Sequence, residues 1–240
     1  MSLLQCVEVQ TRENASATIV WLHGLGADGY DFVPLVRELE NLGAPAARYV
    51  FPHAPTRAVT INGGAVMRAW YDILGSELVR REDEPGIRQS QHDVEALIAR
   101  ENERGVPNTR IVLAGFSQGG AIALQTGLRM TQPLAALLAL STYLPLAQTL
   151  VQERTVASAG VPILMAHGRQ DPIIPLSRAT ASREQLQALG YAVQWHEYPM
   201  AHEVCSAEIE DISGWLRARL GQGLSTPMES RLPGLPPGAR

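Results

Sequence analysis

The sequence predicts an α/β domain in which a mostly parallel central sheet carries helices on both faces. Short apolar runs alternate along the chain with longer segments whose apolar residues recur at helical spacing. Three of the runs, 18–22, 111–114 and 161–166, are almost entirely apolar, which is typical of strands buried on both faces. The length of 240 residues and the hydrophobic content of 45% suit a domain with a sizeable core.

The first half of the chain is expected to hold three strands, one hairpin and two helices. Asp31 is a good helix-capping residue, and Gly105 is a typical helix end. The stretch 62–64, Asn-Gly-Gly, lies between alternating flanks and is typical of a hairpin turn. We therefore expect strands at 6–10, 18–22 and 48–51, a helix at 31–42, a hairpin at 58–67, a polar loop at 75–86 and a helix at 87–104.

The second half continues the alternation until residue 220, where the composition changes. Residues 221–240 are rich in proline and glycine and contain few core-forming side chains. We therefore expect a folded domain over 1–220 and a disordered tail over 221–240. The expected elements are strands at 111–114, 134–141, 161–166 and 192–197, helices at 121–130, 177–189 and 203–220, and an irregular or partly helical connection at 142–160.

Residues 110–121, RIVLAGFSQGGA, contain the strongest functional motif in the chain. An apolar strand, the pattern G-x-S-x-G and a helix-forming segment follow one another, which is the context that a nucleophile elbow requires. Such a turn holds Ser117 in a strained conformation, and Gly115 and Gly119 leave room for the strand and helix that cross there. Ser117 is therefore the expected nucleophile. The alternative is a strand-to-helix turn in which Ser117 is an ordinary helix cap.

The sequence contains no lysine, so its 20 Lys and Arg positions are all arginine. This excludes a Schiff base, a pyridoxal-phosphate anchor, a Ser-Lys dyad and a phosphate-binding lysine of the Walker type. An activated serine in this chain must therefore rely on histidine.

Three of the six histidines follow Ser117 in the chain. Where G-x-S-x-G opens a helix, the acid and then the histidine of a triad follow the serine in sequence. His196 lies inside a strand pattern and His167 closes a strand. His202 lies in a loop between the last strand and the last helix, so we expect it to be the general base.

The acid of the triad is expected between Ser117 and His202. Asp171 directly follows a buried strand, in a loop that Pro172 stiffens. Because ligands bind beyond the carboxyl ends of parallel strands, this position favours Asp171. Taken alone, an Asp-Pro pair is also common in ordinary turns. The other acidic candidates are Glu153, Glu184 and Glu197.

Backbone N–H groups are expected to stabilise the oxyanion that forms beside the nucleophile. One belongs to Gln118, and a second is expected from a loop after an early strand. The stretch 23–26, His-Gly-Leu-Gly, fits because its glycines let the backbone pass close to the reacting carbon. We assign the N–H of Leu25 to this role and expect His23 to fix the loop through a hydrogen bond.

Several stretches together resemble the carboxylesterase, acyl-protein thioesterase and lysophospholipase family of small α/β-hydrolases. They are WLHGLGADGYDF, FPHAP, WYDI, EDEPGIRQS, GFSQGGAIAL, LALSTYLP, HGRQDPIIP and MAHEV. The resemblance implies the α/β-hydrolase fold, the triad Ser117, Asp171 and His202, the two oxyanion donors named above, and no metal or organic cofactor. It also implies a short lid at 73–86, and a homodimer is consistent with it.

We expect a serine hydrolase that cleaves carboxylic esters of short to medium acyl chains through an acyl-enzyme. The connection at 142–160 is too short for a large cap domain, so the site should be open. A shallow substrate groove is expected near Trp70, Ile73, Leu74 and Leu78, although these side chains also suit a plain core. The alternatives are an acyl-protein thioesterase or a lysophospholipase, and, more remotely, a serine peptidase or a non-catalytic binding protein on the same fold.

Composition limits the expected partners and compartment. The formal net charge of -4 gives no electrostatic footprint for nucleic acid, and no apolar run is long enough to span a bilayer. Cys6 and Cys205 suit free thiols in a reducing compartment, and the first residues do not resemble a signal peptide. We expect a cytoplasmic protein without stable membrane insertion, whose partner is a small-molecule or lipid acyl ester substrate.

Overall fold

The computed structural model describes residues 3–13, 15–74 and 81–221, and its centre is a seven-stranded sheet. The strands lie in the order β1-β3-β2-β8-β9-β10-β11. Strand β1 pairs antiparallel with β3, and the other pairs are parallel, as the sequence predicts. The bounds are β1 Cys6–Gln10, β2 Thr18–Leu22, β3 Arg48–Pro52, β8 Ile111–Phe116, β9 Ala136–Leu140, β10 Ile163–Gly168 and β11 Val193–Tyr198.

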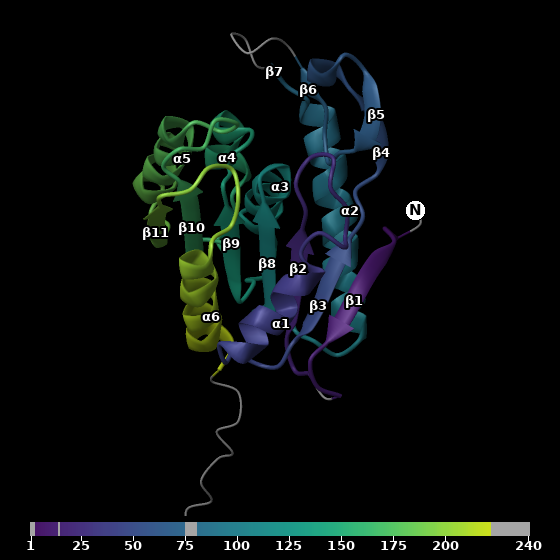
Figure 1. Cartoon of the computed structure of the whole chain (residues 1–240), viewed down its shortest axis with the longest axis vertical. Coiled ribbons are helices and arrows are strands. Elements are labelled where there is room, and N and C mark those ends of the chain that lie inside the picture. Colours follow the sequence, from purple (N-terminus) through teal and green to yellow (C-terminus); the bar gives the residue numbers. More distant parts are fainter. Residues whose placement is uncertain (1–2, 14, 75–80, 222–240) are drawn as a thin grey trace, which may run out of the picture.

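Helices cover both faces of the sheet (Figure 1). Strand β2 shows why two apolar layers form, because Val20 belongs to the core on one face and Trp21 to the core on the other. Helices α1 and α6 pack in the layer of Trp21 and contact each other, whereas α2 to α5 contribute to the layer of Val20. The helix bounds are α1 Val33–Asn41, α2 Glu84–Glu103, α3 Gln118–Gly127, α4 Ala147–Glu153, α5 Leu176–Ala188 and α6 Ser206–Leu220.

The predicted starts of helices α1 and α2 are wrong, and the hydrogen bonds at their first turns show why. Helix α1 begins at Val33, and no side chain caps its first turn, so the predicted capping role of Asp31 is wrong. Helix α2 begins at Glu84 instead of residue 87, because Asp83 accepts a hydrogen bond from the N–H of Gly86 at 3.0 Å. The aspartate that caps a helix therefore lies in the stretch that the sequence pattern assigns to a polar loop.

Two small hairpins lie beyond the carboxyl ends of the parallel strands (Figure 1). The first consists of β4 (Thr56–Val59), a 3₁₀ turn (Thr60–Asn62) and β5 (Ala65–Arg68), close to the predicted hairpin. In the second, β6 (Ile73–Leu74) pairs with β7 (Arg81–Glu82). The middle of the expected lid, residues 75–80, and the expected tail from residue 222 lie outside the described residues.

The part of the chain that the structure describes contains no cluster of three or more His, Cys, Asp or Glu side chains that could hold a metal ion. Within the same residues, no helix has the length and apolar character needed to cross a membrane. Both cysteines are free thiols.

Glu208 is a carboxyl group in the first turn of α6 that is completely buried. Burial raises its pKa from 4.5 to about 8. Between these values the folded protein binds one more proton here than the unfolded chain does. The free energy of unfolding should therefore fall as the pH rises from 4.5 towards about 8.

Glu208→Gln replaces the titrating carboxyl group with a neutral amide, so the melting temperature of the variant should depend less on pH. We expect the melting temperature of the variant minus that of the wild type to rise by several degrees from about pH 6 to about pH 9, measured by scanning calorimetry. A difference between the two melting temperatures that stays constant across this range would contradict the assignment.

Candidate active site

Ser117 lies in a strained turn between β8 and α3, with φ at 55° and ψ at -121°. A side chain at Gly115 would collide with the backbone of Gly119, and one at Gly119 would collide with the carbonyl of Leu22. The N–H of Ser117 donates to the carbonyl of Leu140 at 2.8 Å, which ties the turn to the neighbouring strand. The strain is therefore maintained by close packing and hydrogen bonds, as a nucleophile elbow requires.

Ser117, His202 and Asp171 form a continuous chain of hydrogen bonds. His202 Nε2 lies 2.9 Å from Ser117 Oγ, and His202 Nδ1 lies 2.7 Å from Asp171 Oδ2. Because the carboxylate of Asp171 can only accept, Nδ1 carries the proton and Nε2 is free to accept one from the serine hydroxyl. The structure thus brings together the three side chains that the sequence predicts as a triad.

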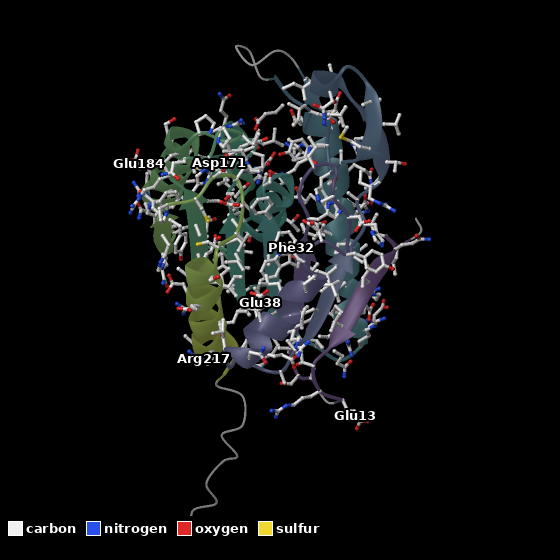
Figure 2. The ribbon with its side chains drawn as sticks, viewed as in Figure 1. Glu13, Phe32, Glu38, Asp171, Glu184 and Arg217 are labelled. Carbon is white, nitrogen blue, oxygen red and sulfur yellow. The ribbon has the colours of Figure 1, made fainter. Side chains whose placement is uncertain are left out.

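The loop after β10 fixes Asp171 from its other side. Asp171 Oδ1 accepts hydrogen bonds from the N–H groups of Ile173 and Ile174, at 2.8 and 2.9 Å. The carboxylate is completely buried. Figure 2 shows Asp171 near the carboxyl ends of the parallel strands, whereas Glu184, another acidic candidate, lies on the outside of α5.

The loop that carries His202 packs directly on the end of β10. A side chain at Gly168 would collide with the carbonyls of Met200 and Ala201, so this glycine permits the close approach. The ring of Phe116 lies 4.8 Å from the ring of His202 and covers one side of it. The loop extends to Cys205, and α6 therefore begins at residue 206 instead of the predicted residue 203.

His167 is a second imidazole beside Asp171, and sequence reasoning gave it no role. Its Nε2–H donates to the carbonyl of Ile174 at 2.8 Å, and the same nitrogen lies 3.4 Å from Asp171 Oδ2. Burial lowers the pKa of His167, so the ring is neutral near neutral pH and ties the acid-bearing loop to β10. Its position at a strand end, four residues before Asp171, was the available signal.

The loop after β2 passes beside Ser117, and His23 holds it in place. His23 Nε2 accepts the N–H of Ala54 at 3.0 Å, and Nδ1–H donates to the carbonyl of Gly24 at 2.7 Å. Burial lowers the pKa of His23 to about 4, which keeps it neutral. The hydrogen-bonding role that the sequence predicts for His23 is confirmed.

The two residues predicted to donate N–H groups to the oxyanion are Leu25 and Gln118. Leu25 and Gln118 both line the cavity that contains the serine. Gln118 is the first residue of α3, so its N–H belongs to the helix turn that has no partner within the helix. The Gln118 side chain accepts the N–H of Trp70 and donates to the carbonyl of Tyr71, each at 2.7 Å. These bonds anchor the segment 71–73, which also lines the cavity.

A cavity of about 410 Å³ opens over Ser117 and combines an apolar part with a polar part. Its volume lies within the range of small-molecule sites. The apolar lining consists of Leu25, Ile61, Ile73, Pro172, Ile173 and Ile174. The polar lining beyond the serine and Gln118 consists of Asn62, Tyr71, Asp72, Glu82, Tyr143 and Arg178.

The four residues predicted to bind substrate differ in where they lie relative to the cavity. Ile73 lines the cavity, and Leu74 is half-buried but is not among the lining residues. Trp70 is completely buried and lies outside the lining, because its indole N–H donates to the carbonyl of His23 at 2.8 Å and fixes the loop after β2. Leu78 lies outside the described residues.

Comparison with known proteins places this geometry in a family context. Residues 4–220 match the family model described as Phospholipase/Carboxylesterase. Acyl-protein thioesterase 1 of Gibberella zeae is 38% identical over 214 residues, which cover 85% of this chain and 91% of the relative.

Two solved structures have closely similar folds. Acyl-protein thioesterase 2 of Zea mays has a TM-score of 0.78 and 28% identity, covering 90% of this chain and 99% of the other. The esterase PE8 has a TM-score of 0.79 and 25% identity, covering 91% and 100%. The chain therefore belongs to the phospholipase/carboxylesterase family of serine hydrolases and has the α/β-hydrolase fold.

Proposed function

We propose that this chain hydrolyses acyl thioesters and the corresponding acyl esters, with Ser117 as nucleophile. The observation that carries the proposal is the unbroken hydrogen-bonded chain from Ser117 through His202 to Asp171 at the floor of a partly apolar cavity. Such a chain activates a hydroxyl for attack on a carbonyl carbon.

In the proposed mechanism, His202 Nε2 removes the Ser117 proton as the hydroxyl attacks the acyl carbon. Asp171 stabilises the imidazolium that forms. The N–H groups of Leu25 and Gln118 bind the oxyanion, and loss of one such donor typically lowers kcat by about 10²- to 10³-fold. The oxyanion collapses as His202 gives its proton to the leaving thiol or alcohol, and the neutral ring then removes a proton from the water molecule that releases the acid from the acyl-enzyme.

Thioesters are the favoured natural substrate class, in preference to the short and medium oxygen esters that the sequence suggested. Two of the similar proteins described above are named acyl-protein thioesterases. Thioesters also suit the site chemically, because a thiol with a pKa of about 8.5 leaves more readily than an alcohol. The apolar side chains near Ser117, such as Ile73 and Ile174, suit an acyl chain.

The test is a set of matched substrates that differ only in the atom joined to the acyl carbon. Octanoyl and palmitoyl groups are presented as a thioester, an oxygen ester and an amide of one leaving group. We expect kcat/KM to be highest for the thioester and undetectable for the amide. A lysophospholipid is included as a fourth substrate.

Each other outcome contradicts a defined part of the proposal. A preference for the oxygen ester would restore the general carboxylesterase, and dominant turnover of the lysophospholipid would indicate a lysophospholipase. Amide turnover would indicate a peptidase. Absence of all turnover, together with no labelling by a fluorophosphonate probe, would indicate a binding protein on the same fold.

A further inference from the structure

Arg178 contributes a positive charge to the wall of the cavity that contains Ser117. It lies in the first turn of α5 and is partly buried. Its guanidinium carbon lies 3.4 Å from the centre of the Tyr143 ring, so the cation packs against an aromatic face. Stacking fixes the position of the cation without using its N–H donors.

The ring beneath Arg178 is itself fixed by a buried hydrogen bond. The hydroxyls of Tyr143 and Tyr71 lie 2.8 Å apart, and both tyrosines are almost completely buried. Burial raises the pKa of Tyr71 well above its usual range, so its hydroxyl stays neutral. Arg178 therefore rests on a rigid support, and its charge is not balanced by a phenolate.

The two acidic side chains in the cavity lining accept hydrogen bonds from groups other than Arg178. Asp72 accepts the N–H of Thr60 at 2.7 Å and the Thr60 hydroxyl at 2.5 Å. The carboxylate of Glu82 accepts the N–H of Leu146 at 3.2 Å. Within the described ranges, Arg178 has no carboxylate within 4.0 Å and no side-chain hydrogen bond, so its donors are available to a ligand.

A purely hydrocarbon substrate does not explain this wall. An alkyl chain that filled the whole cavity would cover a guanidinium without supplying hydrogen-bond acceptors, which is costly. A carboxylate or phosphate would instead accept two N–H groups of the fixed fork. The apolar lining around Ser117 and the cation of Arg178 together suit a substrate with a short apolar segment and an anionic group.

We propose that Arg178 is a specificity-determining residue that binds an anionic group of the acyl thioester substrate. The inference rests on the proposed function and narrows its substrate class. The anion belongs either to the far end of the acyl chain or to the leaving group. Both sources present the same chemistry to Arg178, and the experiment distinguishes them.

The test compares thioesters that differ only in charge. In the acyl arm, glutaryl, adipoyl and suberoyl thioesters of N-acetylcysteamine are compared with the same compounds carrying a terminal amide in place of the carboxylate. In the leaving-group arm, butanoyl thioesters of N-acetylcysteine and of its amide are compared. We expect kcat/KM to favour the anion by about tenfold or more in one arm, the scale of a hydrogen bond to a charged group.

Arg178→Met should abolish this preference, so that the anionic thioester and its neutral counterpart have equal kcat/KM in this variant. Arg178→Lys should keep part of it, because the charge remains but the planar fork is lost. Arg183→Met is the matched control. Arg183 lies on the same helix but stacks 5.0 Å from the Trp195 ring, outside the cavity lining, so this variant should behave as the wild type.

The outcomes separate failure of this inference from failure of the proposed function. Normal turnover of the neutral thioesters without anion preference in either arm, or a preference that survives in Arg178→Met, would overturn the role of Arg178 alone. Absence of turnover of every thioester would contradict the proposed function. In that case calorimetric binding to Ser117→Ala decides, and equal affinity for the anionic and neutral compounds would overturn this inference too.

Discussion

Ser117→Ala is expected to lower kcat for thioester and ester hydrolysis by about 10⁶-fold, the scale of loss when the serine of such a triad is removed. The physical reason is that no other hydroxyl lies within hydrogen-bond distance of His202 Nε2 among the described residues. The fold should not change, because among the described residues the Ser117 side chain forms a hydrogen bond only with His202. Turnover of an octanoyl thioester and the melting temperature should be measured together.

The matched control is Ser177→Ala, which removes an exposed serine hydroxyl on α5. This variant should keep both full turnover and the wild-type melting temperature. A Ser117→Ala protein that is folded and retains more than about one thousandth of wild-type kcat would remove Ser117 from the nucleophilic role.

Asp171→Asn is expected to lower kcat by about 10⁴-fold with little effect on stability. The asparagine oxygen can still accept the N–H groups of Ile173 and Ile174, so the loop keeps its shape. Its NH₂ group, however, faces His202 Nδ1, which must then accept a hydrogen bond. The proton moves to Nε2, and His202 loses the lone pair that would take the Ser117 proton.

Asp211→Asn is a chemically matched control, because Asp211 also contacts a histidine. His196 Nδ1 on β11 lies 3.1 Å from Asp211 Oδ2 on α6. Wild-type kcat in this variant and a large loss in Asp171→Asn would locate the effect in the triad. Loss of less than about tenfold in Asp171→Asn would show that Asp171 does not orient the catalytic base.

The neighbourhood of the triad side chains could be predicted from sequence because the topology of a parallel sheet determines it. Ser117 and Asp171 follow the strands β8 and β10, and the loop of His202 follows β11. All three strands end at the same edge, so residues far apart in the chain meet there whatever the intervening sequence is. The motif around Ser117 supplied the starting point, and chain order supplied the rest.

The walls of the cavity could not be predicted in the same way. Trp70 and Ile73 are both apolar side chains that suit a core or a groove, yet Trp70 packs behind the loop after β2 and Ile73 lines the cavity. The difference depends on a hydrogen bond between the indole and the carbonyl of His23, which no local pattern contains. Residue type alone does not distinguish a buried apolar side chain from one that lines a groove.

The polar wall of Arg178 and its tyrosine support also escaped sequence reasoning. Tyr71, Tyr143 and Arg178 come from three separate segments, and their contact depends on how α5 and the connection after β9 pack. The predicted first residues of α1 and α2 were wrong for a related reason. Asp31 and Asp83 are equally good capping residues in sequence, and only the second accepts a hydrogen bond from a helix N–H.

The most direct test of the central claim is to map the covalent intermediate. The protein is mixed with an octanoyl thioester, quenched in acid within the first turnover, and digested for mass spectrometry. The account predicts one octanoyl group, located on the peptide that contains Ser117 and absent in Ser117→Ala. An octanoyl group on Cys205 or Cys6 instead, or continued turnover without an adduct on Ser117, would contradict it.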